Sequence, residues 1–345
     1  MAEIHANDPE LHPSSRIRIA VSMGDPNGIG PEILAKVLVD HAITDRIELI
    51  PVGSVSVLRH YMERVGQDGP EPYVEDVATD TEFELLPGRA DPSAGRLAMH
   101  SVERAVEMCL EGRVDAMTTC PISKEVIAHA GFNFPGHTEF IAEKTGTGEV
   151  LMMMVSGSLR VGLVSAHIPL SRVAGAVTIE SVQRTIGLMA DSLRKDFGME
   201  RPKIAVLGLN PHAGDGGVMG NEERDVIVPA MAGLSVEAEL TGPFPADGFF
   251  GSGKWKKVDG VVAMYHDQGL GPFKALSFGQ GVNMTAGLPV VRTSPDHGTG
   301  FDIAGTDAAD PSSLRAALIL AAEVAERRKN ALQSTGGPST AEIEA

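Results

Sequence analysis

Short apolar runs alternate along this chain with longer stretches of helical periodicity, and this alternation restricts the fold more than any other feature. The apolar runs are predicted strands and cover residues 17–23, 47–53, 115–121, 150–157, 159–166, 203–209 and 260–266. Amphipathic helices are predicted over residues 95–112, 179–198 and 311–330. Apolar strands separated by such helices are typical of a mostly parallel sheet covered by helices, so we predict an α/β fold.

The charge of the chain excludes several classes of function. The 345 residues carry a formal net charge of −17. Such a surface repels nucleic-acid phosphates and anionic lipid, so we expect no nucleic acid and no membrane as a partner. A small anionic substrate stays possible if a local cationic pocket overrides the overall field.

The ends of the chain and its cysteines indicate a cytoplasmic protein. Residues 1–15 lack the apolar core of a signal peptide, and no apolar stretch reaches the length of a membrane span. Cys109 and Cys120 form no CxxC motif and are expected to be reduced thiols. We expect residues 1–15 and 331–345 to be disordered.

Three histidines lie at the carboxyl ends of predicted strands. His167, His212 and His266 stand at the carboxyl ends of three apolar runs, where a parallel sheet forms its ligand crevice. Neutral imidazoles that converge there suit a divalent transition metal. A single histidine in such a loop more often forms ordinary hydrogen bonds, so the prediction of a metal site depends on all three.

The turn after the first predicted strand is rich in glycine. Gly28 and Gly30 precede a helix that is predicted to open at Pro31, and glycine lets a ligand approach the backbone closely. The spacing is not the GxGxxG of dinucleotide-binding folds. A tight strand-to-helix turn without a ligand is therefore the alternative.

Several polar residues suggest an anion site. His137 and Thr138 precede a predicted helix, whose free N–H groups favour an anion, although Thr138 could simply cap the helix. Arg292 ends an apolar run, and a buried guanidinium there should meet a carboxylate or a phosphate. From its sequence context alone, Lys274 is an ordinary surface charge.

Taken together, the motifs GDPNGIGPE, GHTEF, GLNPHAGDGG, YHDQGL and VRTSPDHGTGFDIAGT resemble 4-hydroxythreonine-4-phosphate dehydrogenases, which act in pyridoxal 5′-phosphate biosynthesis. The resemblance covers residues 16–330. GDPNGIGPE and HGTGFDIAG are also similar to turns of the wider isocitrate and isopropylmalate dehydrogenase superfamily. The family implies two α/β/α domains with the active site in the cleft between them. It places an NAD-binding domain at 16–125 plus 283–330, and a metal, substrate and dimerisation domain at 126–282.

The resemblance also implies roles for individual residues. It makes His167, His212 and His266 the ligands of one divalent metal ion (Zn, Mg or Co), in a site shared between the subunits of a homodimer. It places the substrate, a small phosphorylated anion, against His137, Thr138, Lys274, Asn283 and Arg292. It places NAD against Gly28, Gly30, His297, Gly298 and Asp302. A carboxylate at Asp302 would accept hydrogen bonds from the ribose 2′-OH and repel a 2′-phosphate, which favours NAD over NADP.

The reaction implied is the oxidation and decarboxylation of 4-phosphooxy-L-threonine to 3-amino-2-oxopropyl phosphate. Asp247, Asp267 and Lys274 are the candidates for the general base. Relatives that oxidise erythronate 4-phosphate or aromatic cis-dihydrodiols are alternatives within the family. Outside it, a metal-dependent hydrolase could use the three histidines to activate water, and a non-catalytic binding protein is a third reading.

Overall fold

The computed structural model describes residues 16–66, 72–78, 83–132, 134 and 136–335. Its strands form one continuous 11-stranded sheet in the order β3-β2-β1-β4-β11-β10-β5-β6-β9-β7-β8. The strands are β1 (Ile17–Ser22), β2 (Ile47–Gly53), β3 (Glu75–Asp76), β4 (Ala116–Thr119), β5 (Leu151–Ser156), β6 (Leu159–Ser165), β7 (Lys203–Leu207), β8 (Glu239–Phe244), β9 (Gly260–Tyr265), β10 (Val282–Ala286) and β11 (Arg292–Pro295).

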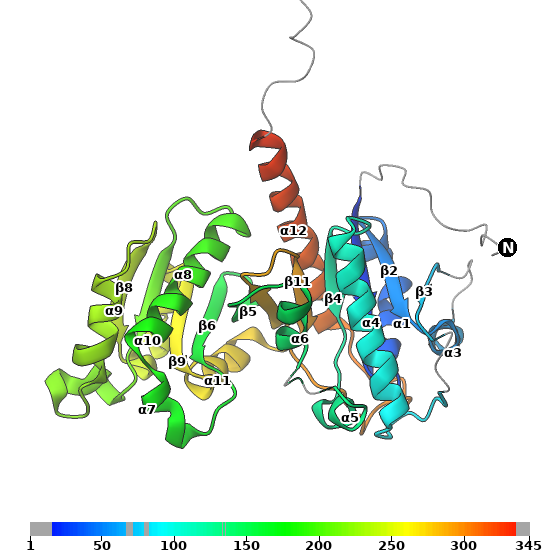
Figure 1. Ribbon diagram of the computed structural model, residues 1–345, viewed down its shortest axis with the longest axis horizontal. Coiled ribbons are helices and arrows are strands. Elements are labelled where there is room, and N and C mark those ends of the chain that lie inside the picture. Colours follow the sequence, from blue (N-terminus) through cyan, green and yellow to red (C-terminus); the bar gives the residue numbers. More distant parts are fainter. Residues whose placement is uncertain (1–15, 67–71, 79–82, 133, 135, 336–345) are drawn as a thin grey trace, which may run out of the picture.

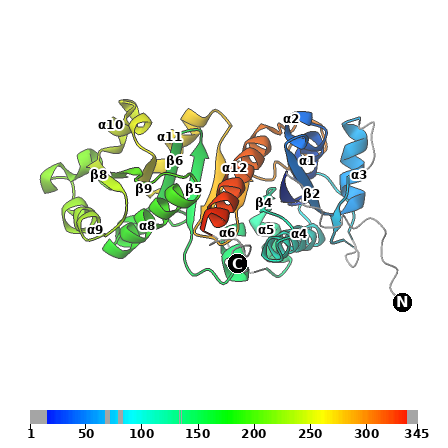
Figure 2. The ribbon, with the colours of Figure 1, turned by 90° about the horizontal axis from the view of Figure 1, so that it is seen from above.

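Helices cover both faces of this sheet, which confirms the predicted α/β class. They are α1 (Gly30–Leu38), α2 (His41–Thr44), α3 (Val55–Arg64), α4 (Pro92–Leu110), α5 (Lys124–His129), α6 (His137–Lys144), α7 (Val173–Ala176), α8 (Ile179–Lys195), α9 (Val228–Ala232), α10 (Ala246–Gly251), α11 (His266–Ser277) and α12 (Ser312–Thr335). In Figure 1 and Figure 2, α1–α4 gather around one end of the sheet and α8–α11 around the other, with α12 between them.

The sheet is mostly parallel, as predicted. Seven of its ten strand pairings are parallel, and the three antiparallel ones join β11, β10, β5 and β6 in the middle. Each of the seven predicted strands is present. The prediction missed β3, β8, β10 and β11, which are very short or rich in polar, Gly and Pro residues.

Local sequence explains where several helices begin. Ser54, Asp91 and Ser123 accept hydrogen bonds from backbone N–H groups in the first turns of α3, α4 and α5. Helix α1 begins at Gly30 and carries Pro31 in its first turn, where proline loses no intrahelical hydrogen bond. The predicted start of this helix is confirmed.

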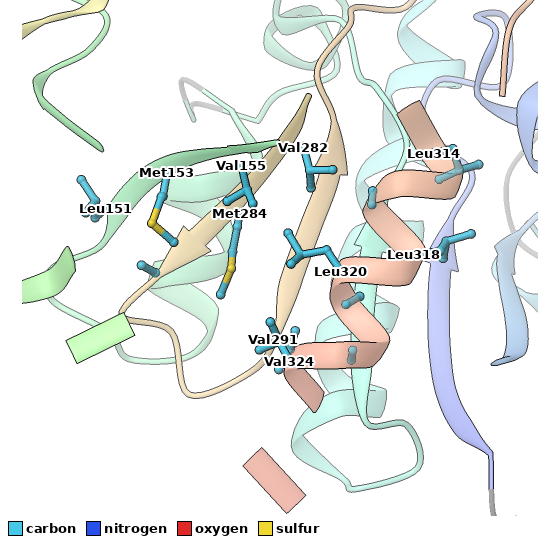
Figure 3. Close-up of a cluster of buried hydrophobic side chains, with 14 of the residues drawn as sticks. Leu151, Met153, Val155, Val282, Met284, Val291, Leu314, Leu318, Leu320 and Val324 are labelled. Atoms are coloured by element: carbon cyan, nitrogen blue, oxygen red, sulfur yellow. The ribbon is translucent and has the colours of Figure 1, made fainter. Parts of the chain in front are cut away.

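Helix α12 packs across the middle of one sheet face. Side chains of β10 and Val291, which directly precedes β11, meet the apolar side of α12, and Met153 of β5 belongs to the same apolar cluster, as Figure 3 shows. This core continues without interruption under α1 and α8. Burial of this apolar surface fixes the two ends of the sheet to each other.

The opposite face is covered in two separate parts. One apolar cluster lies under α4, α5 and α6, and a second lies under α10 and α11. The middle strands lie between these two clusters and carry polar side chains on this face. The fold thus leaves a site open at the centre of the sheet.

Helix α12 corrects one prediction. It continues to Thr335, so residues 331–335, which we expected to be disordered, are helical. The rest of the predicted disorder, residues 1–15 and 336–345, lies outside the described residues. None of the helices in the described part of the chain has the length and apolarity needed to cross a lipid bilayer.

Candidate active site

A cavity of about 340 Å³ occupies the open middle of the sheet face. Residues alternate between the two faces along each strand, so Arg292 and Ser294 of β11 point into the cavity while Thr293 points towards α12. Helix α6, which Figure 1 shows beside β11 and β5, forms another wall. The polar lining residues are Thr119, Lys124, His137, Thr138, Glu139, His167, Asn283, Arg292, Ser294 and His297.

The cavity concentrates polar atoms that have no partner. Among the described residues, nine buried side-chain nitrogen or oxygen atoms lack a hydrogen bond, and four of them belong to residues of this lining. The four are His137 Nε2, Asn283 Oδ1, Arg292 Nε and His297 Nε2. Buried polar groups are normally hydrogen-bonded, so this group of unsatisfied atoms indicates a place built for a polar ligand.

Arg292 is the most unusual residue of the cavity. Its side chain is 2% exposed, and its two terminal nitrogens donate to Thr285 Oγ1 at 3.1 Å and Thr119 Oγ1 at 2.8 Å. Across the described ranges, no carboxylate forms an ion pair with it. Burial lowers its pKa to about 10, so it stays charged at neutral pH. A buried cation without an acid should attract an anionic ligand.

Helix α6 presents its amino terminus to the same cavity. Gly136 is the cap residue and no side chain caps the helix, so the capping role considered for Thr138 is not observed. Thr138 instead lines the cavity beside His137. Burial, with smaller contributions from the nearby cations Arg292 and Lys124, holds the pKa of His137 well below its usual range. The imidazole is therefore neutral and can donate or accept a hydrogen bond.

Two of the three predicted metal ligands lie side by side. The ring centroids of His167 and His266 are 5.8 Å apart, and Asp267 Oδ1 lies 2.7 Å from His266 Nδ1. Burial, together with Lys124 and His266, lowers the pKa of His167. Within the single chain, no three His, Cys, Asp or Glu side chains of the described residues are arranged to hold a metal ion.

The third predicted ligand, His212, lies in an unusual turn. Residues 212–216 all have positive φ, and three of these five residues are not glycine. Such left-handed backbone costs about 1–2 kcal/mol per non-glycine residue and is concentrated at functional sites. His212 is exposed to solvent and does not line the cavity of its own chain.

The two segments predicted to bind NAD lie in contact. The Ile29 N–H donates to Thr299 O at 2.9 Å, and His297 and Gly298 of the second segment line the cavity. A Cβ at Gly28 would lie 2.8 Å from Thr299 O, and one at Gly30 would lie 2.1 Å from Met23 O. The protein's own backbone therefore requires both glycines. Asp302 lies further along this segment and is exposed.

The three candidates for the general base lie outside the cavity lining. Asp247 is exposed in the first turn of α10, and the Asp267 side chain is 90% exposed. Lys274 Nζ is 3.3 Å from Asp296 Oδ1, next to the cavity residue His297. None of the three touches Arg292 or His137 in the single chain.

Sequence reasoning missed four lining residues. Thr119 ends β4, Lys124 begins α5, Glu139 lies in the first turn of α6, and Ser294 lies on β11. Thr119 and Lys124 could have been predicted as site residues from their place at the carboxyl end of β4 and just after it, because ligands of parallel sheets bind beyond that edge.

Comparisons with known proteins place the chain in a family. The model of the family "Pyridoxal phosphate biosynthetic protein PdxA" matches residues 37–321. A 4-hydroxythreonine-4-phosphate dehydrogenase of Bacteroides thetaiotaomicron is 42% identical over 91% of this chain and 90% of its own length. The crystal structure of 4-hydroxythreonine-4-phosphate dehydrogenase from Klebsiella pneumoniae is 38% identical, with a TM-score of 0.79 over 90% of this chain and all of that one.

A more distant relative has a different substrate in its name. A terephthalate 1,2-cis-dihydrodiol dehydrogenase of Burkholderia xenovorans is 28% identical, with a TM-score of 0.61 over 89% of this chain and 98% of that chain. Both the family model and the relatives at about 40% identity confirm the resemblance that the motifs predict. The chain is an enzyme that belongs to the pyridoxal phosphate biosynthetic protein PdxA family.

Proposed function

We propose that this chain oxidises and decarboxylates 4-phosphooxy-L-threonine to 3-amino-2-oxopropyl phosphate, with NAD as the hydride acceptor and a divalent metal ion in the site. The observation that carries the proposal is the buried, unpaired guanidinium of Arg292 in an open cavity. The names of the relatives supply the substrate. A phosphorylated amino acid offers the anion that Arg292 lacks.

The cavity residues would hold the anionic groups of the substrate. Arg292 can donate from Nε, which has no partner among the described residues, and the uncapped amino terminus of α6 offers backbone N–H groups beside it. His137 and Asn283 each have a buried atom free for a neutral hydrogen bond. Thr138 and Lys274 complete the proposed substrate contacts, Lys274 from the rim near Asp296.

His167, His212 and His266 would hold the metal ion. His167 and His266 already lie together, and an Nδ1–H of His266 that donates to Asp267 leaves Nε2 free for a metal. When bound, a divalent cation polarises a hydroxyl or carbonyl oxygen and stabilises negative charge that develops on it. Zn, Co and Mg are the proposed metals.

A homodimer would complete this metal site. His212 is the third donor, and it lies in a turn whose neighbours Val218 and Met219 are exposed, at 81% and 46%. Ile168 and Leu170, which follow His167, are exposed as well, at 38% and 75%. Apolar side chains next to two separated ligands fit a face that a second copy of the chain covers. We therefore propose that His212 of a second copy joins His167 and His266.

NAD would lie along the contact between the turn at Gly28 and Gly30 and the segment from His297 to Asp302. His297 and Gly298 connect this segment to the cavity, and exposed Asp302 is free to bind a ribose hydroxyl. Bound there, the cofactor would supply the hydride acceptor for the oxidation at C3 of the substrate.

The remaining steps need a base and an acid. The C3 hydroxyl must lose a proton as the ketone forms, and C2 must gain one after carbon dioxide leaves. Asp247, Asp267 and Lys274 stay the proposed proton acceptors. Lys274 is the one beside a cavity residue, since its partner Asp296 precedes His297.

The test is NADH formation from 4-phosphooxy-L-threonine with purified protein, with and without a chelator. We expect turnover with NAD, weaker turnover with NADP, and loss of activity on chelation. Erythronate 4-phosphate and a cis-dihydrodiol are the comparison substrates, and a clear preference for either would contradict the proposal. NADH formation would also exclude the hydrolase and the non-catalytic readings.

A further inference from the structure

The segment from His297 to Asp302, which is proposed to contact NAD, continues into a turn that ends at Asp307. Asp307 has a φ of 63°, a left-handed backbone conformation that glycine adopts freely and aspartate less readily. Gly305, two residues earlier, is left-handed as well, with a φ of 74°. A left-handed residue other than glycine persists only where surrounding contacts hold it, so this turn needs an anchor.

Arg64, in the last turn of α3, supplies that anchor. Its Nε donates to Asp307 Oδ1 at 2.9 Å, and one terminal nitrogen donates to Asp307 Oδ2 at 2.8 Å and to the Gly305 carbonyl at 2.9 Å. A simple ion pair at the surface contributes little to stability. A carboxylate held by two nitrogens, with a third hydrogen bond to the backbone, is the geometry in which such a pair does contribute.

Helix α1 holds the chain directly after this turn. Lys36 Nζ donates to the carbonyls of Asp307 at 2.8 Å and Ala309 at 2.7 Å, and Glu32 Oε1 accepts from the Ala309 N–H at 2.9 Å. Helices α1 and α3 lie side by side, as Figure 2 shows. Among the described residues, Arg64 is the one whose side chain forms hydrogen bonds with the Asp307 carboxylate.

The segment is also fixed on the near side of Asp302. A Cβ at Gly88 would lie 2.8 Å from Phe301 O, and one at Gly305 would lie 2.8 Å from Pro87 Cβ, so the loop at residues 87–88 packs against both positions. Asp302 lies between these two contacts and is itself exposed. Its place therefore depends on the chain being held on both sides.

We propose that Arg64 is a positioning residue for NAD: it holds the turn at Gly305 and Asp307 and thereby keeps Asp302 in place for the ribose of the cofactor. The inference rests on the proposed function and deepens it. Without Arg64 the turn relaxes, and the segment has to be ordered when NAD binds, which weakens binding. The substrate site should not change, because Arg64 does not line the central cavity.

A purely structural role for Arg64 is the main alternative. It would lower the free energy of unfolding of Arg64→Met and leave its affinity for NAD unchanged. The substitution Asp307→Gly separates the two roles, because glycine adopts the left-handed conformation without an anchor. Arg194→Met is the matched control, since Arg194 of α8 is 42% exposed, similar to the 36% of Arg64, and pairs with Glu237 near the other end of the sheet.

The experiment is titration calorimetry with purified, metal-loaded, full-length protein, in which NAD and 4-phosphooxy-L-threonine are titrated separately. In Arg64→Met we expect the Kd for NAD to rise about 5- to 20-fold, with the Kd for the substrate within about twofold of wild type. In Arg64→Met/Asp307→Gly the Kd for NAD should return to within about threefold of wild type. Arg194→Met should leave both values unchanged. Amide hydrogen exchange of residues 302–307 should be faster in Arg64→Met than in wild type or the control.

Three results would overturn the inference. They are an Arg64→Met protein that binds NAD as tightly as wild type, a double variant that binds NAD as weakly as Arg64→Met, and an equal loss of affinity for NAD and for the substrate. A wild type that binds no NAD would refute the proposed function and this inference together. A wild type that binds NAD but does not oxidise the substrate would refute the proposed function alone.

Discussion

Two largely buried arginines are associated with the segment that forms β10 and β11, and they have opposite surroundings. Arg328 of α12 is 11% exposed and pairs through Nε with Asp196 at 2.7 Å, and it also donates to the carbonyls of Leu288 and Pro289. Arg292 of β11 is buried more deeply, at 2% exposed, but its partners are two threonine hydroxyls, and no acid of the described residues pairs with it.

The difference separates a structural charge from a functional one. Asp196 is 1% exposed, so the Arg328 pair satisfies both charges within the protein and fastens α12 to α8. Arg292 keeps part of its hydrogen-bonding capacity unused and directs it into a cavity. Removing the first should affect stability, and removing the second should affect catalysis.

The largest effect is expected for Arg292→Met. Loss of the guanidinium removes the principal partner of the substrate anion, so kcat/KM should fall by about 10³-fold, or about 4 kcal/mol. The free energy of unfolding should drop by no more than about 1 kcal/mol, because a buried charge disappears as well. Steady-state kinetics and urea unfolding measure the two quantities, and a kcat/KM within threefold of wild type would end the functional assignment of this residue.

Arg328→Met should have the opposite effect, a loss of stability with little change in kcat/KM. The substitution leaves Asp196 buried without its cation, which should lower the free energy of unfolding by about 3 kcal/mol. kcat/KM of the folded fraction should stay within about twofold, since Arg328 lies away from the cavity. Urea unfolding and kinetics again provide the readout. A variant with wild-type stability would show that the ion pair makes no net contribution to stability. That result would contradict the structural role assigned to Arg328.

Asp25 is a third buried ionisable residue to compare with the two arginines, and only one of its two carboxylate oxygens has a hydrogen-bond partner among the described residues. It is 1% exposed, Oδ1 accepts from the Asn27 N–H, and Oδ2 has no partner among the residues described. Burial raises its pKa to about 6. Its neutral form is therefore favoured on folding, and the associated stability is present below pH 4 and lost as the pH rises through 6.

Asp25→Asn should remove this pH dependence. The variant should be more stable than wild type above pH 7, by at most about 3 kcal/mol, and the advantage should vanish near pH 3.5. Urea unfolding at several pH values between 3.5 and 8 measures it. An advantage that is constant with pH would contradict the raised pKa.

The smallest effect is expected for Lys124→Met. Lys124 lines the cavity but is exposed, so water and salt screen its charge far more than that of Arg292. KM for the phosphorylated substrate should rise about fivefold, and the difference should shrink at high salt. Lys144→Met is the matched control, because Lys144 pairs with Glu103 on the outside of α6. Equal effects of the two substitutions on KM would mean that the net charge of the protein, and not the position of Lys124 in the cavity, determines the effect.

The sequence predicted the fold well where packing alone decides it. Strand β9 and the buried part of β1, Ile19–Val21, are continuously apolar because helices bury both of their faces, and the pattern is visible without a structure. Strands β10 and β11 escaped prediction because Asn283, Arg292 and Ser294 face the cavity. Polar residues of the site break the apolar pattern by which a strand is recognised.

The residues of the candidate site could be predicted from the sequence, but their interactions with one another could not. Motifs singled out His137, Asn283 and Arg292, but no pattern along the chain could reveal that Arg292 lacks an acid, because that depends on residues from distant strands. The end of α12 was misjudged for a different reason. The residues Ala331, Leu332 and Gln333 favour a helix by themselves, so α12 continues past the predicted helix end at residue 330.

The most direct test is a crystal structure of the protein with 4-phosphooxy-L-threonine and without NAD. The account predicts that the phosphate or the carboxylate lies within hydrogen-bond distance of Arg292 Nε, in the cavity beside the amino terminus of α6. Density for the ligand elsewhere, with Arg292 still bound only to Thr119 and Thr285, would contradict it.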